Sequence, residues 1–263
     1  MPKMMKVQDM KNQYKLVAFD IDGVLNEHGG NIMDESIEAI GLLKSRGIQV
    51  CFASGKHAWY VQGGLVWSGL LDQNTLIVAE NGGVIFDPST RRTITEEKYI
   101  RDVVMLRNIY RNLISRDGGF LKFAGITVWE EPKETLFCLF PKNLDDIIKL
   151  KNILTEIVEL NNLNLKVVQN PDSIDVLQSG ISKATGLAYV CDWLGIEMNN
   201  IIAFGDNIND LEMLGAVGLP VTVDNAVAPT KDLVKSRSGY IAQEICGRGV
   251  LEAVKHLIDN KII

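Results

Sequence analysis

The chain has 263 residues, which is enough for one large domain or two smaller ones, each with its own core. Apolar residues make up 46% and charged residues 23%, as in ordinary soluble globular proteins. The formal net charge of −6 and the pI of about 5.2 argue against a protein that binds nucleic acid or an anionic membrane.

Several features lead us to expect a cytoplasmic protein. The amino-terminal segment MPKMMKVQDMKNQ lacks the apolar stretch of a signal peptide, and no apolar run reaches the ~18 residues that suggest a membrane span. The cysteines at 51, 138, 191 and 246 form no C-x-x-C pair and are expected to be reduced thiols. The three histidines have no metal-ligand spacing, which argues against a zinc enzyme.

The first part of the chain alternates short apolar strands with helices. Strands are predicted over Leu16–Phe19, Ile48–Ala53 and Leu76–Ala79, and helices over Asp34–Ser45 and Ala58–Leu70. Continuous apolar strands separated by helices are typical of a parallel sheet that is covered on both faces.

The pattern changes after Gly83. Six elements are predicted in the next stretch: a helix over Glu97–Leu113, strands over Lys122–Trp129 and Thr135–Phe140, a helix over Asn143–Leu160, and strands over Leu165–Val168 and Ser173–Leu177. Their order predicts a separate α+β unit.

The alternating pattern then resumes. Five further elements are predicted: a helix over Ser182–Leu194, a strand over Asn200–Phe204, a helix starting over Asp210–Gly215, a strand over Leu219–Val223 and a closing helix over Gly249–Leu257. The sequence therefore predicts an α/β fold, a doubly wound parallel-sheet core of residues 1–86 and 178–263. A smaller α+β domain of residues 87–177 is inserted into it.

Polar residues follow several of the predicted strands. The strand ends are marked by Asp20 and Asp22, by Ser54-Gly55-Lys56, by Glu80-Asn81-Gly82-Gly83 and by Gly205-Asp206-Asn207-Ile208-Asn209-Asp210. Open parallel sheets bind ligands at the carboxyl ends of their strands, so these groups are expected to gather at one edge. Residues two apart in an extended segment point the same way, and residues four apart share one face of a helix.

Carboxylates gathered at one edge predict a metal site. Asp20, Asp22, Asp206 and Asp210 would repel one another unless a divalent cation lay between them, and hard oxygen ligands favour Mg²⁺. Lys183, at the start of a predicted helix, adds positive charge, so the site suits a phosphate. One carboxylate could then attack a phosphoryl group while its neighbour acts as general acid and base.

With these motifs the sequence resembles the haloacid dehalogenase (HAD) superfamily of phosphatases. The resemblance is carried, in the order of the family's four motifs, by Asp20-Ile-Asp22-Gly-Val-Leu, Ser54-Gly55, Lys183 and Gly205-Asp206-x-x-Asn209-Asp210. The insert resembles the α+β cap of the Cof-type subclass. Its shortness and the ending Gly247-Arg-Gly249 are similar to archaeal-type phosphoglycolate phosphatases.

The resemblance implies a role for each matching residue. Asp20 would be the nucleophile and a metal ligand, and Asp22 the general acid and base, with its backbone carbonyl on the metal. Ser54, Gly55, Lys183 and Asn209 would bind the phosphoryl group, with Ser54 and Lys183 taking part in catalysis. Asp206 and Asp210 would complete the Mg²⁺ site, and the cap would read the leaving group.

The resulting hypothesis is a Mg²⁺-dependent phosphatase of a small phosphorylated metabolite, phosphoglycolate or a sugar phosphate, which forms an aspartyl-phosphate. No nucleic-acid or membrane partner is expected, and a homodimer is left open. Three alternatives stay open as well: a phosphosugar mutase, a phospho-accepting regulatory domain and a binding protein without catalysis. Metal-dependent phosphate release would separate the first hypothesis from all three.

Overall fold

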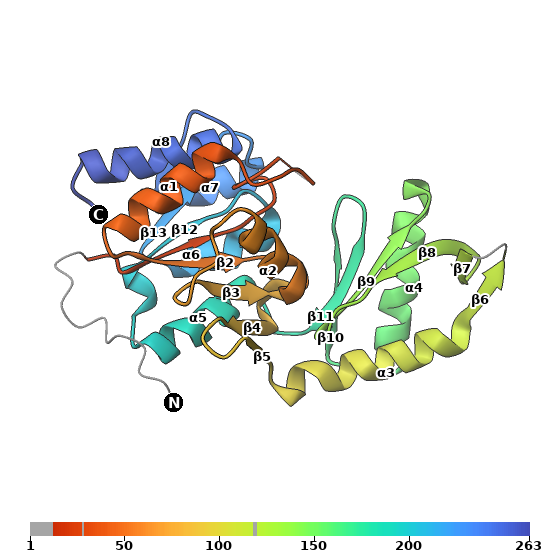
Figure 1. Cartoon of the computed structure of the whole chain (residues 1–263). Coiled ribbons are helices and arrows are strands. Elements are labelled where there is room, and N and C mark those ends of the chain that lie inside the picture. The colour runs from red at the N-terminus through yellow and green to blue at the C-terminus, as the bar shows by residue number, and fades with distance from the viewer. Residues whose placement is uncertain (1–12, 28, 118–119) are drawn as a thin grey trace. The chain divides into compact units, whose positions relative to one another are not determined.

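A computed structural model describes residues 13–263 of the chain apart from 28, 118 and 119 (Figure 1). The chain divides into two compact units. The core unit runs to Ile94 and resumes at Ser182, and the inserted unit is Thr95–Ile181. The sequence placed the insert at 87–177. Residues 1–12, most of the amino-terminal segment that was predicted not to be a signal peptide, lie outside the described residues.

The core unit contains an eight-stranded sheet with the order β14-β13-β12-β1-β2-β3-β4-β5. Its strands are β1 Leu16–Phe19, β2 Gln49–Ala53, β3 Leu76–Ala79, β4 Val84–Asp87, β5 Arg92–Ile94, β12 Ile201–Phe204, β13 Leu219–Thr222 and β14 Tyr240–Ile241. The strands from β14 to β3 are parallel. Strand β1 lies between β2 and β12, with Phe19 beside both Phe52 and Phe204.

Helices cover both faces of this sheet, because residues along each strand alternate between two apolar clusters. Val17 and Phe19 of β1 pack with helices α1, α2 and α8, whereas Leu16 and Ala18 pack with α5, α6 and α7. The helices are α1 Asp34–Ser45, α2 Ala58–Trp67, α5 Lys183–Leu194, α6 Leu211–Ala216, α7 Ala228–Ser236 and α8 Cys246–Asp259. Short 3₁₀ helices of this unit are η1 Glu80–Gly82, η3 Met198–Asn200 and η4 Ile208–Asp210. The predicted doubly wound parallel sheet is confirmed.

The core sheet extends further than the sequence indicated. After η1 the chain turns back, and β4 and β5 form an antiparallel hairpin that extends the sheet beyond β3, the last of the parallel strands. Residues up to Ile94 therefore belong to the core unit. The hairpin has no helix between its strands, so it lacks the alternation by which the other core strands were recognised.

The inserted unit has a six-stranded antiparallel sheet with the order β10-β11-β9-β8-β7-β6. Its strands are β6 Ile114–Asp117, β7 Phe120–Phe123, β8 Ile126–Glu131, β9 Leu136–Pro141, β10 Leu165–Gln169 and β11 Ile174–Gln178, and its helices are α3 Glu97–Leu113, η2 Leu144–Asp146 and α4 Ile147–Leu160. Apolar side chains of α3 and α4 pack with one face of this sheet around Tyr110.

One strand prediction in the inserted unit is wrong. Residues 122–129 form the end of β7 and the start of β8, not a single strand. Ala124 and Gly125 separate them, with φ of 49° and 82°, a left-handed pair that reverses the chain. The apolar alternation on both sides of Ala124-Gly125 hid this two-residue turn.

None of the helices in the described part of the chain is long and apolar enough to span a bilayer. The four cysteines are all buried and free.

Candidate active site

The first candidate residue follows the central strand of the core sheet. Asp20 comes directly after β1, and its backbone N–H donates to the carbonyl of Phe204 at 2.9 Å. Only 5% of Asp20 is exposed. Ile21 packs into the apolar cluster under α1, and Gly23 turns the chain with a φ of 85°. A Cβ at Gly23 would collide with the Asp206 carboxylate, so only glycine allows these two loops to meet.

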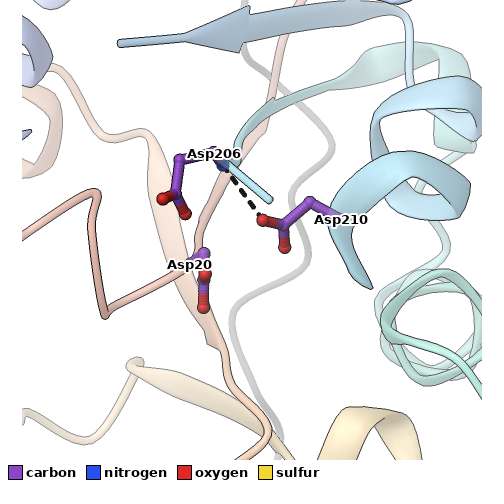
Figure 2. A group of neighbouring side chains, drawn as sticks. All are labelled: Asp20, Asp206 and Asp210. Carbon is purple, nitrogen blue, oxygen red and sulfur yellow. Dashed lines mark hydrogen bonds between the residues drawn. The ribbon is translucent and has the colours of Figure 1, made fainter. Parts of the chain in front are cut away.

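Asp206 and Asp210 come from the loop after β12 and are both buried. The Asp210 carboxylate accepts hydrogen bonds from the backbone N–H groups of Asp206 and Asn207, each at 3.0 Å. Gly205 is needed here because a Cβ would collide with the Asp210 side chain. The backbone therefore holds Asp210 in place and turns it back toward Asp206 (Figure 2).

Lys183 is the first residue of α5, and only 1% of it is exposed. Ser182 caps the helix, exchanging hydrogen bonds with Thr185. The Lys183 ammonium lies 2.7 Å from an oxygen of Asp20 and 2.7 Å from an oxygen of Asp210. It therefore joins two carboxylates that are 190 positions apart in sequence.

These four side chains form one buried charged group. Asp20, Asp206 and Asp210 each offer a carboxylate oxygen, and these oxygens lie within 4.8 Å of one another (Figure 2). Burial raises the pKa of the Asp20 carboxyl well above its ordinary value, and the charges of Asp210 and Asp206 add to the rise while Lys183 offsets part of it. Burial alone would lower the pKa of Lys183, but its carboxylate neighbours raise it above the ordinary value.

The group fits a divalent cation. With all four side chains ionised it carries two net negative charges, which are costly to bury without a counterion. Three carboxylate oxygens at this spacing are the donors that a hard cation such as Mg²⁺ takes.

Asp22 lies apart from this group. Its carboxylate pairs with the ammonium of Lys56 at 3.1 Å and is partly exposed. From the sequence we expected the carboxylates of all four aspartates to gather at this edge of the sheet. In the described part of the chain, three of them form the group, and the fourth faces the loop after β2.

Ser54 and Gly55 lie in the loop after β2. Because Phe19 and Phe52 are neighbours in the sheet, this loop and Asp20 lie at the same edge. Ser54 is buried, and its hydroxyl oxygen accepts a hydrogen bond from the backbone N–H of Lys56 at 3.2 Å. Asn209, by contrast, is exposed on η4, and no hydrogen bond between described residues joins it to the carboxylates.

The turn after β3 connects the two halves of the site. The N–H of Glu80 donates to the carbonyl of Lys56, and the N–H of Asn81 to that of Ser54, both at 3.0 Å. Glu80 and Asn81 have φ of 51° and 55°, a strained pair for residues other than glycine. A Cβ at Gly82 would collide with the carbonyl oxygen of Ser182.

This turn is therefore packed between the Ser54 loop and the start of α5. The sequence analysis placed its Asn-Gly-Gly run at a strand end but assigned it no role in the site. Its consecutive glycines could have indicated this packing, because glycines after a buried strand are typical of close contact between backbone segments.

The chain is similar in sequence to known hydrolases and phosphatases. A family model described as haloacid dehalogenase-like hydrolase matches residues 17–123 and 115–254. The chain is 28% identical to a 5-amino-6-(5-phospho-D-ribitylamino)uracil phosphatase of Bacillus subtilis, over 97% of this chain and 100% of that protein. It is also 28% identical to a phosphoglycolate phosphatase of Methanobrevibacter smithii, over 92% of this chain and 97% of the relative.

Solved structures support the fold. A haloacid dehalogenase-like hydrolase from Bacteroides thetaiotaomicron superposes with a TM-score of 0.71 at 21% identity, covering 93% of this chain and 99% of that one.

Proposed function

Because the chain belongs to the haloacid dehalogenase-like hydrolase family and is a phosphatase, we propose that it hydrolyses a small phosphorylated metabolite with the help of Mg²⁺ and through an aspartyl-phosphate at Asp20. The observation that carries the proposal is the buried group in which Lys183 lies 2.7 Å from both Asp20 and Asp210, with Asp206 beside them.

The metal would be held by the carboxylates of Asp20, Asp206 and Asp210 and by the backbone carbonyl of Asp22. When bound, Mg²⁺ would neutralise charge on the carboxylates and on the phosphoryl oxygens, so that the two anions can approach. Lys183 would carry the remaining positive charge and fix the orientation of Asp20 through their ion pair.

In the first step, a carboxylate oxygen of Asp20 attacks phosphorus while the bond between phosphorus and the leaving oxygen breaks. Asp22 donates a proton to that oxygen, and the alcohol departs. In the second step, Asp22 takes a proton from water as the water oxygen attacks phosphorus. The bond from phosphorus to Asp20 breaks and inorganic phosphate leaves, so that Asp20 is again a carboxylate and Asp22 again a carboxylic acid.

Other residues of the site would bind the phosphoryl group. The Ser54 hydroxyl and the backbone of Gly55 lie at the same sheet edge as Asp20 and are assigned this task, together with Lys183. Asn209 is assigned an assisting role from its exposed position on η4. The inserted unit is assigned the role of cap, so changes within it are expected to alter substrate choice more than the rate of phosphoryl transfer.

Phosphoglycolate and a sugar phosphate are the candidate substrates. The names of the relatives differ on this point. One is a phosphoglycolate phosphatase, whereas another acts on a phosphoribitylamino-uracil. The product in every case would be inorganic phosphate and an alcohol.

The test is phosphate release from a panel of phosphorylated metabolites, with Mg²⁺ and with EDTA. We expect release that requires the metal and is lost in Asp20→Asn. Asp192→Asn, which removes an exposed carboxylate on α5, is the matched control and should keep its activity. No release from any compound by the wild type, or full activity in Asp20→Asn, would refute the proposal.

A further inference from the structure

A cavity of about 550 Å³ lies beside the predicted acid in the core unit. Asp22 and Lys56 line it, together with apolar side chains from the loop before α1 and from α2, such as Ile32 and Leu65. The remaining polar side chains of the wall are Asn26, Asn31 and Ser68. Its volume is in the range of roughly 300–1,000 Å³ that is typical of small-molecule sites. The two-carbon leaving group of phosphoglycolate would fill a small part of this space.

Two aromatic side chains of α2 line the same cavity and are strongly exposed. Tyr60 is 64% exposed and Trp67 is 92% exposed. Single exposed apolar residues need no explanation, but two aromatic rings at one cavity offer a surface that a ligand can cover. Trp59 of the same helix is also half-exposed, but it packs on Phe86 with ring centroids 6.2 Å apart.

Lys56 links the aromatic side of the cavity to the acid. Its ammonium lies 3.1 Å from the Asp22 carboxylate and 5.3 Å from the centre of the Tyr60 ring. An organic group that reaches Asp22 through this cavity would therefore meet the Tyr60 ring next to the ammonium.

We propose that this cavity holds the part of the leaving group nearest Asp22, and that this part carries a planar aromatic or heteroaromatic ring, while the cap reads the rest of the leaving group. The inference rests on the proposed function, because it takes Asp22 as the acid that protonates the leaving oxygen. A general acid must come within about 2.6–3.2 Å of the oxygen it protonates, so the organic part of the substrate begins where the Asp22 side chain lies. That side chain forms part of the cavity wall.

The two exposed aromatic side chains of the wall favour a ligand that contains a ring. Aromatic rings stack on aromatic side chains with a gain beyond the apolar area that they bury. A ring that is also close to Lys56 adds an attraction between the ammonium and its face.

The experiment compares 2-phenylethyl phosphate with ethyl phosphate. Both are monoesters of a primary alcohol, so they differ in the ring and little in the chemistry of the leaving oxygen. Phosphoglycolate is measured alongside. We expect the wild type to have a kcat/KM for 2-phenylethyl phosphate about tenfold or more above that for ethyl phosphate. Tyr60→Ala and Trp67→Ala should each lower this ratio several-fold, mainly through KM.

The ratio is used because a variant that merely folds less well loses both activities together. Trp59→Ala is the matched control, since it removes a half-exposed tryptophan of the same helix that does not line the cavity, and it should keep the wild-type ratio. Tyr60→Phe should also keep the ratio, because it retains the ring.

The outcomes separate this inference from the proposed function. Equal or better turnover of ethyl phosphate or phosphoglycolate by the wild type would overturn the ring preference and leave the phosphatase proposal standing. A ring preference that Tyr60→Ala and Trp67→Ala leave unchanged would overturn the assignment to this cavity. Release of phosphate from no compound would refute the proposed function, and this inference with it.

Discussion

The core unit and the inserted unit differ in what they bury at their centres. The core buries three carboxylates and one ammonium at the end of its central strands. The inserted unit buries Tyr110 between Phe123 and Phe137, with ring centroids 5.1 and 5.0 Å apart. Apolar packing of the second kind stabilises a fold, whereas like charges of the first kind oppose it. The inserted unit also buries Asp102, Lys133 and Asp175, but the three carboxylates that lie within 4.8 Å of one another belong to the core. The comparison indicates that the core places like charges together for chemistry at a cost in stability, whereas the aromatic cluster of the inserted unit serves packing.

The largest effect on this difference between the units is expected when the Lys183 ammonium is removed from the core. Lys183→Met leaves three buried carboxylates without their ammonium, so we expect it to lower the free energy of unfolding by about 3–5 kcal/mol in EDTA and to abolish phosphate release. Urea unfolding measures the first effect. Lys231→Met, which removes a partly exposed partner of Asp224, is the matched control and should cost about 1 kcal/mol or less. Similar costs for both variants would contradict the prediction.

A pair of glycines compares the backbones of the two units. Gly82 of the core and Gly125 of the inserted unit both have positive φ, 105° and 82°. A Cβ at Gly82 would collide with the Ser182 carbonyl, whereas a Cβ at Gly125 would meet no atom of the described residues within 4 Å. We expect Gly82→Ala to cost about 2–4 kcal/mol and to reduce activity, because the turn packs on the start of α5. Gly125→Ala should cost about 1 kcal/mol and leave phosphate release unchanged. Thermal unfolding and activity assays of both variants test this difference.

Metal binding should stabilise the core alone. At a Mg²⁺ concentration ten times the dissociation constant, we expect about 1.4 kcal/mol of added stability, which EDTA reverses. The same titration should have no effect on Asp206→Asn combined with Asp210→Asn, which lacks two of the three carboxylates. Hydrogen exchange measured by mass spectrometry would place the protection in the loops after β1 and β12. Protection confined to peptides of the inserted unit would contradict the assignment.

The smallest effect is expected in the inserted unit. The Tyr110 hydroxyl is buried and has no hydrogen-bond partner among the described residues. Tyr110→Phe should therefore leave stability unchanged or raise it by about 1 kcal/mol at pH 7. Tyr189→Phe on α5, which changes a more exposed ring, is the control and should have no effect.

The contribution of Tyr110 to the free energy of unfolding is expected to depend on pH. Burial raises the pKa of Tyr110 to about 12, and the charge of Glu130 adds to the rise. In the unfolded chain a tyrosine has a pKa of about 10. The folded state thus prefers the neutral phenol, so the stability from this group is complete below pH 10 and is lost as the pH rises toward 12. As the pH rises from 10 to 12, the free energy of unfolding of Tyr110→Phe should fall less than that of the wild type. Urea unfolding of both proteins at several pH values in this range measures the difference.

Much of the core fold could be predicted from the sequence, because its strands are continuous apolar runs separated by helices. The strand Leu76–Ala79 was predicted with the bounds that β3 has. The hairpin of β4 and β5 was missed, since two short antiparallel strands at a sheet edge lack this alternation. In the inserted unit the turn at Ala124-Gly125 was missed, because alanine is an uncommon residue at positive φ.

The candidate site was predictable as a set of residues at one sheet edge, but not as a set of contacts. Spacing along a strand cannot show that the Asp22 carboxylate pairs with Lys56. Nor does it show that Lys183 lies between Asp20 and Asp210, because that contact depends on how α5 meets the loops after β1 and β12. The cavity beside α2 also escaped sequence reasoning, because the apolar pattern of the predicted helix over Ala58–Leu70 does not show that Trp67 is 92% exposed.

The position of β1 has a consequence for how the protein is made. Strand β1 pairs with β2 on one side and with β12 on the other, and its partner for Leu16 is Ile201. At about 5–20 residues per second, a ribosome needs roughly 10–40 s to reach β12 after it has made β1. During this interval one edge of the most central strand is unpaired and open to other chains. We expect this unpaired edge to make the nascent chain prone to pairing with other chains. Asp20 can contact Lys183, Asp206 and Asp210 only after the ribosome has passed residue 210 of the 263.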